Sequence, residues 1–269
     1  MVSEYYSRLK QALRFVAGKG YQPVYVALRG SQNYHLSTEH SDYDYVAVVV
    51  PCFDDLVEKS WIQTKEYEYD GGHIDMYDIR EYFSCIWKMN PSILETLMTP
   101  HHIDTTQDKV FNSCYTYIVE AIPYKAGSLA LAIKGMFMRY LKLYGRGLGS
   151  GLGKSMSHMV RLIVYMERLY THQIFDPDLL IGSKSSHAVA MAYKEMSDEA
   201  VLASNPQERV DWFTERITKL CDTILCQNQK HTDSSRVEMY HQRINDIVSR
   251  VIKEYIKEEM REEDEGNQA

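Results

Sequence analysis

Residues 28–46 read LRGSQNYHLSTEHSDYDYV. The short apolar run before them, 23–28, is rich in β-formers and predicts a strand that ends at Gly30 and Ser31. A helix should begin there. Free backbone N–H groups at a helix start, beside a glycine that permits close approach, suit a phosphate group. About ten residues on, Ser41 precedes Asp42 and Asp44, where a second strand, 43–50, is predicted.

The aspartates of this segment form a candidate metal site. Alternate residues of a strand share a face, so Asp42 and Asp44 should project together. Neighbouring carboxylates repel each other unless a cation lies between them, and Mg²⁺ prefers oxygen ligands. Asp75, inside the apolar strand 73–77, is the candidate third ligand. Asp78 is the alternative, although its place before a helix favours a capping role. A purely structural role for each acid at a strand edge is the competing interpretation.

The remaining pattern predicts an α+β protein. Segments 61–69 and 73–77 should form a hairpin around Asp70-Gly71-Gly72, and a helix should start near Ile79. Asn90-Pro91-Ser92 predicts another helix through Met98, with Ser92 as its N-cap. Beyond 107 the periodicity is helical throughout, without a predicted strand. The expected helices are 107–121, 126–144, 154–171, 185–196, 198–228 and 234–262.

The motif spacing resembles the nucleotidyltransferase fold of the DNA polymerase beta superfamily. It is most similar to an uncharacterised bacterial and phage branch, which also shows segments like Tyr77-Asp78-Ile79-Arg80 and Asn90-Pro91-Ser-Ile-Leu-Glu95. The resemblance covers about residues 20–100. It implies a small mixed sheet in a catalytic domain, 1–105, followed by an all-helical domain, 106–269, with an acidic C-terminal tail. His35 and the pair Val46-Ala47 depart from that branch.

The resemblance also implies an activity. Asp42, Asp44 and Asp75 would hold two Mg²⁺ ions, with Mn²⁺ as a substitute, while Gly30, Ser31 and Ser41 would hold the triphosphate. The expected reaction moves an NMP from an NTP, with ATP as the expected nucleotide, to a hydroxyl acceptor and releases pyrophosphate. Asp75 would be the general base. The acceptor stays open between an RNA end, a protein and a small molecule. The alternative is a non-catalytic nucleotide-binding or regulatory partner, antitoxin-like, on the same fold.

Charge is unevenly distributed along the chain. The formal net charge of −7 argues against a protein that coats nucleic acid. Yet residues 121–166 carry seven basic side chains and no acid, which leaves −14 on the rest. Within that interval, Lys134, Lys154 and Arg161 are the residues we expect to bind the triphosphate. His158 lies between the last two. A solvated helix face that happens to lack acids is the competing interpretation.

Membrane segments, cysteines and a P-loop-like stretch give further predictions. No window has the apolar length of a membrane span, and the N-terminus lacks a signal core, so no membrane partner is expected. The five scattered cysteines are interpreted as reduced thiols of a cytoplasmic protein. Residues 145–155 mimic a P-loop, but Leu148 stands where glycine is required. Residues 145–155 are therefore predicted to form a hinge, with Ser155 as the cap of the next helix.

His101-His102 is expected in a loop. The Met and Tyr residues of 136–144 and 156–170 are expected in the core. The oligomeric state stays open.

Overall fold

The computed structural model describes residues 2–58, 61–146, 151–178, 184–204, 206–231 and 233–266. The strands are β1 (Gln22–Arg29), β2 (Asp44–Val50), β3 (Lys65–Tyr69), β4 (Gly72–Asp78) and β5 (His102–Asp104). The helices within and before the sheet region are α1 (Val2–Ala17), α2 (Phe53–Val57), α3 (Ile79–Trp87) and α4 (Pro91–Met98), with a 3₁₀ turn η1 (Gly30–Gln32). The later helices are α5 (Val110–Gly145), α6 (Leu152–His172), α8 (Lys184–Glu195), α9 (Asp198–Ala203), α10 (Pro206–His231) and α11 (Ser234–Gly266).

The five strands form one mixed sheet in the order β3-β4-β2-β1-β5. The central pair, β1 and β2, is antiparallel, whereas β2 and β4 are parallel with Val46 opposite Asp75. Partners in register lie on the same face, so Asp44, Val46 and Asp75 belong to one side of the sheet. The chain therefore has the predicted α+β class, with a small mixed sheet and mostly helical residues elsewhere.

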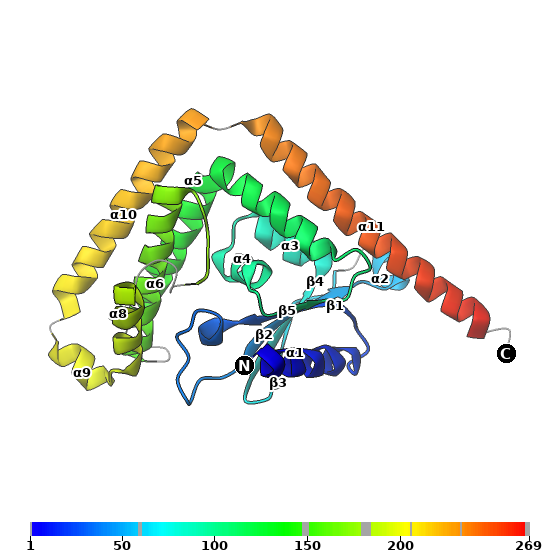
Figure 1. The fold of residues 1–269 in the computed structure, drawn as a ribbon, viewed down its shortest axis with the longest axis horizontal. Coiled ribbons are helices and arrows are strands. Elements are labelled where there is room, and N and C mark those ends of the chain that lie inside the picture. The colour runs from blue at the N-terminus through cyan, green and yellow to red at the C-terminus, as the bar shows by residue number, and fades with distance from the viewer. Residues whose placement is uncertain are drawn as a thin grey trace.

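The two faces of the sheet are covered by different helices (Figure 1). Helix α1 covers one face, where Leu9, Ala12 and Val16 pack against β-strand residues such as Val26 and Val49. The other face packs under α3, α4 and α5 in a larger cluster. That cluster continues without a break into α6, α10 and α11, so it joins residues on both sides of position 105. The division into units 1–105 and 106–269 stays a prediction.

Helix starts confirm some local predictions and correct others. Asp78 caps α3 as expected, with its carboxylate accepting from the Arg80 N–H at 2.8 Å. The N-cap of α4 is Asn90, not Ser92, because Asn90 Oδ1 accepts from the Ser92 N–H at 3.1 Å. Ser155 is not a cap either. Helix α6 already starts at Leu152, whose N–H donates to Asp198 Oδ1 at 2.6 Å.

Three predicted element boundaries are also corrected. His102 belongs to the short edge strand β5, which pairs with Ala27, rather than to a loop. The predicted helix 198–228 is divided into α9 and α10, with Pro206 starting the second. Segments 107–121 and 126–144 are one helix, α5, because Pro123 is accommodated inside it.

Helix α5 changes direction partway along its length (Figure 1). Pro123 lacks an N–H and so removes one helix hydrogen bond. Nearby, Asn228 of α10 inserts its side-chain amide: Oδ1 accepts from the Gly127 N–H at 3.1 Å, and Nδ2 donates to the Tyr124 carbonyl at 3.5 Å. Proline and an inserted polar side chain are both recognised causes of helix kinks. The first half of α5 thus covers the sheet while its second half pairs with α6.

The long outer helices α10 and α11 follow the two halves of α5 (Figure 1). The N-terminal part of α10 contacts α6 and α9, and α11 reaches back to α3 and β2. In the described part of the chain, no helix has the length and apolar character needed to cross a lipid bilayer. All five cysteines are free thiols.

Candidate functional site

A cavity of about 400 Å³ lies between the end of β1, the start of β2 and the helices α5, α6 and α8. Its volume is in the range of small-molecule binding sites. Both chain halves contribute to it. The residues that line it are Arg29, Gly30, Ser31, Tyr34, Leu36, Thr38, His40, Ser41, Asp42, Asp44, Ser92, Tyr140, Lys154, Ser157, His158, Arg161 and Lys194.

One wall of the cavity is acidic. Asp44 is the first residue of β2, and exposed Asp42 precedes it by two positions. Gly30 lies directly against Asp44, because a Cβ at Gly30 would stand 2.8 Å from Asp44 Oδ2. Gly30 also has φ +78°, which favours glycine. Only glycine at position 30 lets the β1 end and the Asp44 carboxylate meet this closely.

The turn after β1 is ordered by a second set of contacts. Ser31 is the middle residue of the 3₁₀ turn η1, and the chain then returns toward Ser41. Ser41 Oγ accepts from the Thr38 N–H at 2.8 Å and from Lys194 Nζ at 3.1 Å. The residues Gly30, Ser31 and Ser41 therefore share the cavity with the two aspartates.

Asp75 has a different partner from Asp42 and Asp44. Its carboxylate pairs with the Arg29 guanidinium, and Asp75 is not among the residues that line the cavity. Arg29 stands opposite Asp44 in the β1–β2 register, so its side chain belongs to the same face of the sheet. The Arg29 side chain thus reaches from β1 across β2 to Asp75 on β4.

The opposite wall is basic and comes from one stripe of α6. Lys154, Ser157, His158 and Arg161 are spaced i, i+3, i+4 and i+7, which places them on one helix face. All four line the cavity. Lys194 joins them from α8, donating to the Leu36 carbonyl as well as to Ser41. Acid and base therefore face each other across the same space.

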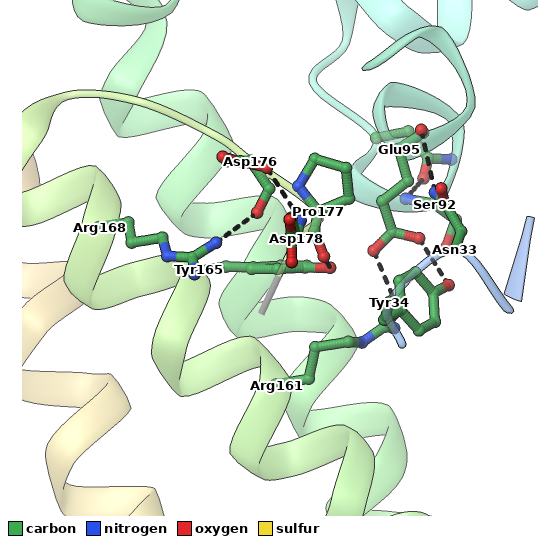
Figure 2. A network of polar contacts seen from close by, with 11 residues as sticks. Asn33, Tyr34, Ser92, Glu95, Arg161, Tyr165, Arg168, Asp176, Pro177 and Asp178 are labelled. Atoms are coloured by element: carbon green, nitrogen blue, oxygen red, sulfur yellow. Dashed lines mark hydrogen bonds and ion pairs between the residues drawn. The ribbon is translucent and has the colours of Figure 1, made fainter. Parts of the chain in front are cut away.

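The cavity residue Arg161 is held in a buried network of polar contacts (Figure 2). Its guanidinium donates to Glu95 Oε1 at 3.0 Å, and the two side chains are only 2% and 1% exposed. The second oxygen of Glu95 accepts from the Tyr34 hydroxyl at 2.7 Å. The Arg161 guanidinium also lies 3.9 Å from the centre of the Tyr34 ring. This network connects the turn that follows η1 with α4 and α6.

Burial and charge set the protonation of the cavity wall. Burial alone would lower the pKa of Arg161, but the Glu95 carboxylate raises it well above its usual value. For His158, burial followed by the positive charges of Arg161, Lys154 and Lys194 lowers the pKa well below 6.5. Burial and the Lys154 ammonium lower the pKa of Lys194. The wall therefore combines a permanent buried cation with a neutral imidazole.

The structure brings together most of the sequence-predicted site residues. Gly30, Ser31, Ser41, Asp42, Asp44, Lys154 and Arg161 all line the cavity. Asp75 lies behind Arg29, and Lys134 lies elsewhere: it faces α10, where its Nζ is 3.9 Å from Asp222 Oδ1. Lys134 and Lys154 are on different helices, so the basic interval does not form one surface.

Sequence reasoning missed several cavity residues, among them Lys194 and Tyr140. Lys194 lies outside the acid-free interval 121–166, and no local pattern marks it. Tyr140 falls in the aromatic and methionine stripe expected to be core, yet it is only half-buried and lines the cavity. The i, i+4 spacing of Lys154 and His158, continued by Arg161, was the available signal for the α6 wall.

The donor chemistry of the acidic wall fits one Mg²⁺ ion. Asp42 and Asp44 offer carboxylate oxygens on the cavity wall next to the Gly30 turn. Mg²⁺ typically binds one or two carboxylates together with phosphates and water. Within the described residues, no group of three His, Cys, Asp or Glu side chains is arranged to hold a metal. A third carboxylate would become available only if Arg29 released Asp75.

Comparison with known proteins adds little to this description. No protein-family model and no curated protein matches the chain. A nucleotidyltransferase-like protein from Exiguobacterium sibiricum 255-15 is a solved structure with some similarity: 10% identity over 91% of each chain, with a TM-score of 0.33. The class defined here is a mixed α+β protein with a five-stranded sheet and an acid–base cavity.

Proposed function

We propose that this chain is a nucleotidyltransferase that moves an NMP from an NTP to a hydroxyl acceptor. The observation that carries the proposal is the 400 Å³ cavity with carboxylates on one wall and cations on the other. A metal–triphosphate complex contains a cation, which the carboxylates would bind, and an anion, which the basic side chains would bind. Neither wall alone would favour that ligand over an ordinary cation or anion.

Each wall has a part in this proposal. The N–H groups of the Gly30–Ser31 turn, together with Ser41, Lys154 and Arg161, hold the phosphates, and Lys194 joins them. Asp42 and Asp44 would hold Mg²⁺, or Mn²⁺ in its place, which supplies charge neutralisation and activation of the acceptor hydroxyl when bound. A second ion would require Asp75. Lys134 has no part here, because it pairs with Asp222 on another surface.

The proposed chemistry is an in-line displacement. The acceptor oxygen forms a bond to the α-phosphorus, the bond from that phosphorus to the bridging β-phosphate oxygen breaks, and pyrophosphate leaves. The acceptor hydroxyl loses its proton to a carboxylate, with Asp75 as the proposed base once Arg29 has moved. The acceptor is an RNA end, a protein or a small molecule. ATP is the expected donor, and a cytoplasmic location belongs to the same proposal.

One observation favours a second candidate, a non-catalytic nucleotide-binding partner module. The Arg29 guanidinium already neutralises Asp75, so the third carboxylate is engaged by the protein itself. A module that only binds a nucleotide needs Asp42, Asp44 and the basic wall. It does not need a free Asp75.

The test is transfer of label from each of four α-phosphate-labelled NTPs, with Mg²⁺ and cell lysate as the source of acceptor. We expect the wild type to label one acceptor class, and Asp44→Asn to remove that labelling while the circular dichroism spectrum stays unchanged. Asp178→Asn provides a matched control outside the cavity. Mg²⁺-dependent nucleotide binding without labelling would favour the binding module, and equal labelling by Asp44→Asn would contradict the catalytic assignment.

A further inference from the structure

Three buried polar atoms without partners belong to residues that line the cavity. Ser157 Oγ, His158 Nδ1 and Arg161 Nε are each buried and have no hydrogen-bond partner among the described residues. All three belong to residues of the α6 stripe that lines the cavity. Buried polar atoms are nearly always paired, because an unpaired one loses its hydration without compensation. Ser157 Oγ and His158 Nδ1 come from successive residues of one wall and point to a ligand that pairs with them, whereas Arg161 Nε belongs to a guanidinium that Glu95 already holds.

An aromatic pair stands at the same place. The Tyr140 ring from α5 stacks on the His158 imidazole, with ring centres 4.4 Å apart and planes inclined by 22°. Tyr140, Ser157 and His158 line the cavity together. Aromatic faces with adjacent hydroxyl and imidazole groups favour a flat, polar-edged ring over a simple anion.

The protonation of His158 separates this part of the wall from the phosphate positions. Burial and the neighbouring cations hold the pKa of His158 well below 6.5, so the imidazole is neutral at pH 7. A neutral imidazole has one donor and one acceptor nitrogen, as a nucleobase edge also has both kinds of group. Phosphates are better bound by the ammonium groups of Lys194, which contacts Ser41, and of the neighbouring Lys154.

We propose that Tyr140, Ser157 and His158 form a nucleobase subsite, which receives the base of the nucleotide whose phosphates lie between Lys154, Lys194 and the aspartates. This inference rests on the proposed function, because it assigns the base of the same nucleotide. It adds that affinity depends on the base as well as on the phosphate chain. It also assigns base discrimination to α5 and α6 rather than to the sheet.

The test compares two kinds of ligand by isothermal titration calorimetry in Mg²⁺: the four NTPs, and inorganic tripolyphosphate, which has no base. For the wild type we expect at least one NTP to bind about tenfold more tightly than tripolyphosphate, as for one or two added hydrogen bonds. Ser157→Ala and His158→Phe should lose most of that advantage and leave the tripolyphosphate affinity unchanged.

Two controls keep the result interpretable. Ser155→Ala is the same substitution on the same helix at a buried serine that does not line the cavity, and it should change neither affinity. Ser157→Ala removes a buried hydroxyl without a partner, so the unliganded melting temperature should stay the same or rise. That readout separates loss of a ligand contact from loss of fold.

The possible outcomes differ for the two proposals. Equal binding of NTPs and tripolyphosphate by the wild type would overturn the nucleobase subsite but leave a polyphosphate site. Wild-type NTP affinity in Ser157→Ala and His158→Phe would also overturn the subsite. Failure of every one of these ligands to bind would overturn the proposed function together with the subsite.

Discussion

Arg161 of α6, which lines the cavity, and Glu95 of α4 form a buried ion pair at 3.0 Å. The pair joins two segments that are 66 residues apart in sequence. It also shares Glu95 with the Tyr34 hydroxyl, so the turn that carries Gly30 and Ser31 is tied to the helix that carries Lys154. The relative position of the acidic and basic walls depends on this contact.

Glu95→Gln should destabilise the fold strongly. The amide keeps the shape of the side chain but leaves the Arg161 cation buried without a counter-charge, which typically costs about 3–5 kcal/mol. Urea denaturation measures the change. The double variant Glu95→Gln with Arg161→Met should recover much of the loss, because no buried charge then remains. A loss below about 1 kcal/mol for the single variant would contradict this account of the pair.

Gly30→Ala should cost more than Gly20→Ala. Both glycines have positive φ, +78° and +86°, so both variants have the backbone penalty of about 1 kcal/mol. Only at Gly30 does the added Cβ meet a neighbour, Asp44 Oδ2 at 2.8 Å, whereas nothing lies within 4 Å at Gly20. Thermal unfolding of the two variants should differ by the cost of displacing Asp44. Mg²⁺ binding should fall only in Gly30→Ala, and identical behaviour of both variants would exclude the close contact.

Arg29→Met should raise the affinity for Mg²⁺ several-fold. The substitution removes the cation that now neutralises Asp75, and so leaves an additional carboxylate free to bind metal. Calorimetric titration with MgCl₂ alone measures the effect. Arg29→Met combined with Asp75→Asn is the matched control and should return to wild-type affinity. If Arg29→Met binds Mg²⁺ no better than the wild type, Asp75 lies outside the metal site.

Lys194→Met should weaken binding of Mg·ATP by tenfold or more, as expected when a charge-assisted contact worth about 1.5–3 kcal/mol is lost. Lys134→Met should leave that binding unchanged, because Lys134 faces Asp222 on α10 and does not line the cavity. Fluorescence titration of both variants gives the comparison. If Lys134→Met weakened binding more than Lys194→Met, the phosphates would bind at the basic interval 121–166 and not in the cavity.

Acid should destabilise the protein partly through His158. Its pKa is well below 6.5 in the folded state and near 6.5 when unfolded, so below pH 6.5 the unfolded chain takes up a proton that the folded chain does not. Above pH 6.5, His158 does not lower the free energy of unfolding. Below pH 6.5, His158 lowers it by up to about 1.4 kcal/mol per pH unit. Denaturation curves at pH 7.5 and 5.5 should differ less for His158→Gln than for the wild type. A pH dependence equal to that of the wild type would contradict the buried neutral imidazole.

Local patterns predicted the sheet better than they predicted the cavity. The turn Asp70-Gly71 and the Asp78 cap are set by contacts within a few residues, and both follow from short motifs. The aspartates of β2 and the Gly30 turn are likewise close in sequence. In contrast, Lys194 reaches the cavity through the packing of α8 on α6, which no local pattern encodes.

The same distinction explains why the roles of individual residues differ from their expected ones. Arg161 has the predicted place on the cavity wall, but Glu95 neutralises it from a segment whose sequence gives no sign of that contact. Asp75 lies on the predicted strand, but the long Arg29 side chain reaches it from β1. Charged partners that come together through tertiary packing cannot be read from residue spacing.

The bend in α5 sets the position of Tyr140 on the cavity wall. Tyr140 lies 13 residues beyond Gly127, about 20 Å along the helix axis. Over that length, a change of one degree at the Pro123–Gly127 bend moves the Tyr140 backbone by roughly 0.3 Å. A change of a few degrees therefore moves Tyr140 by more than the distance range of a hydrogen bond allows. The amide of Asn228 contacts the bend from α10, so we expect a substitution of Asn228 to change the width of the cavity from outside it.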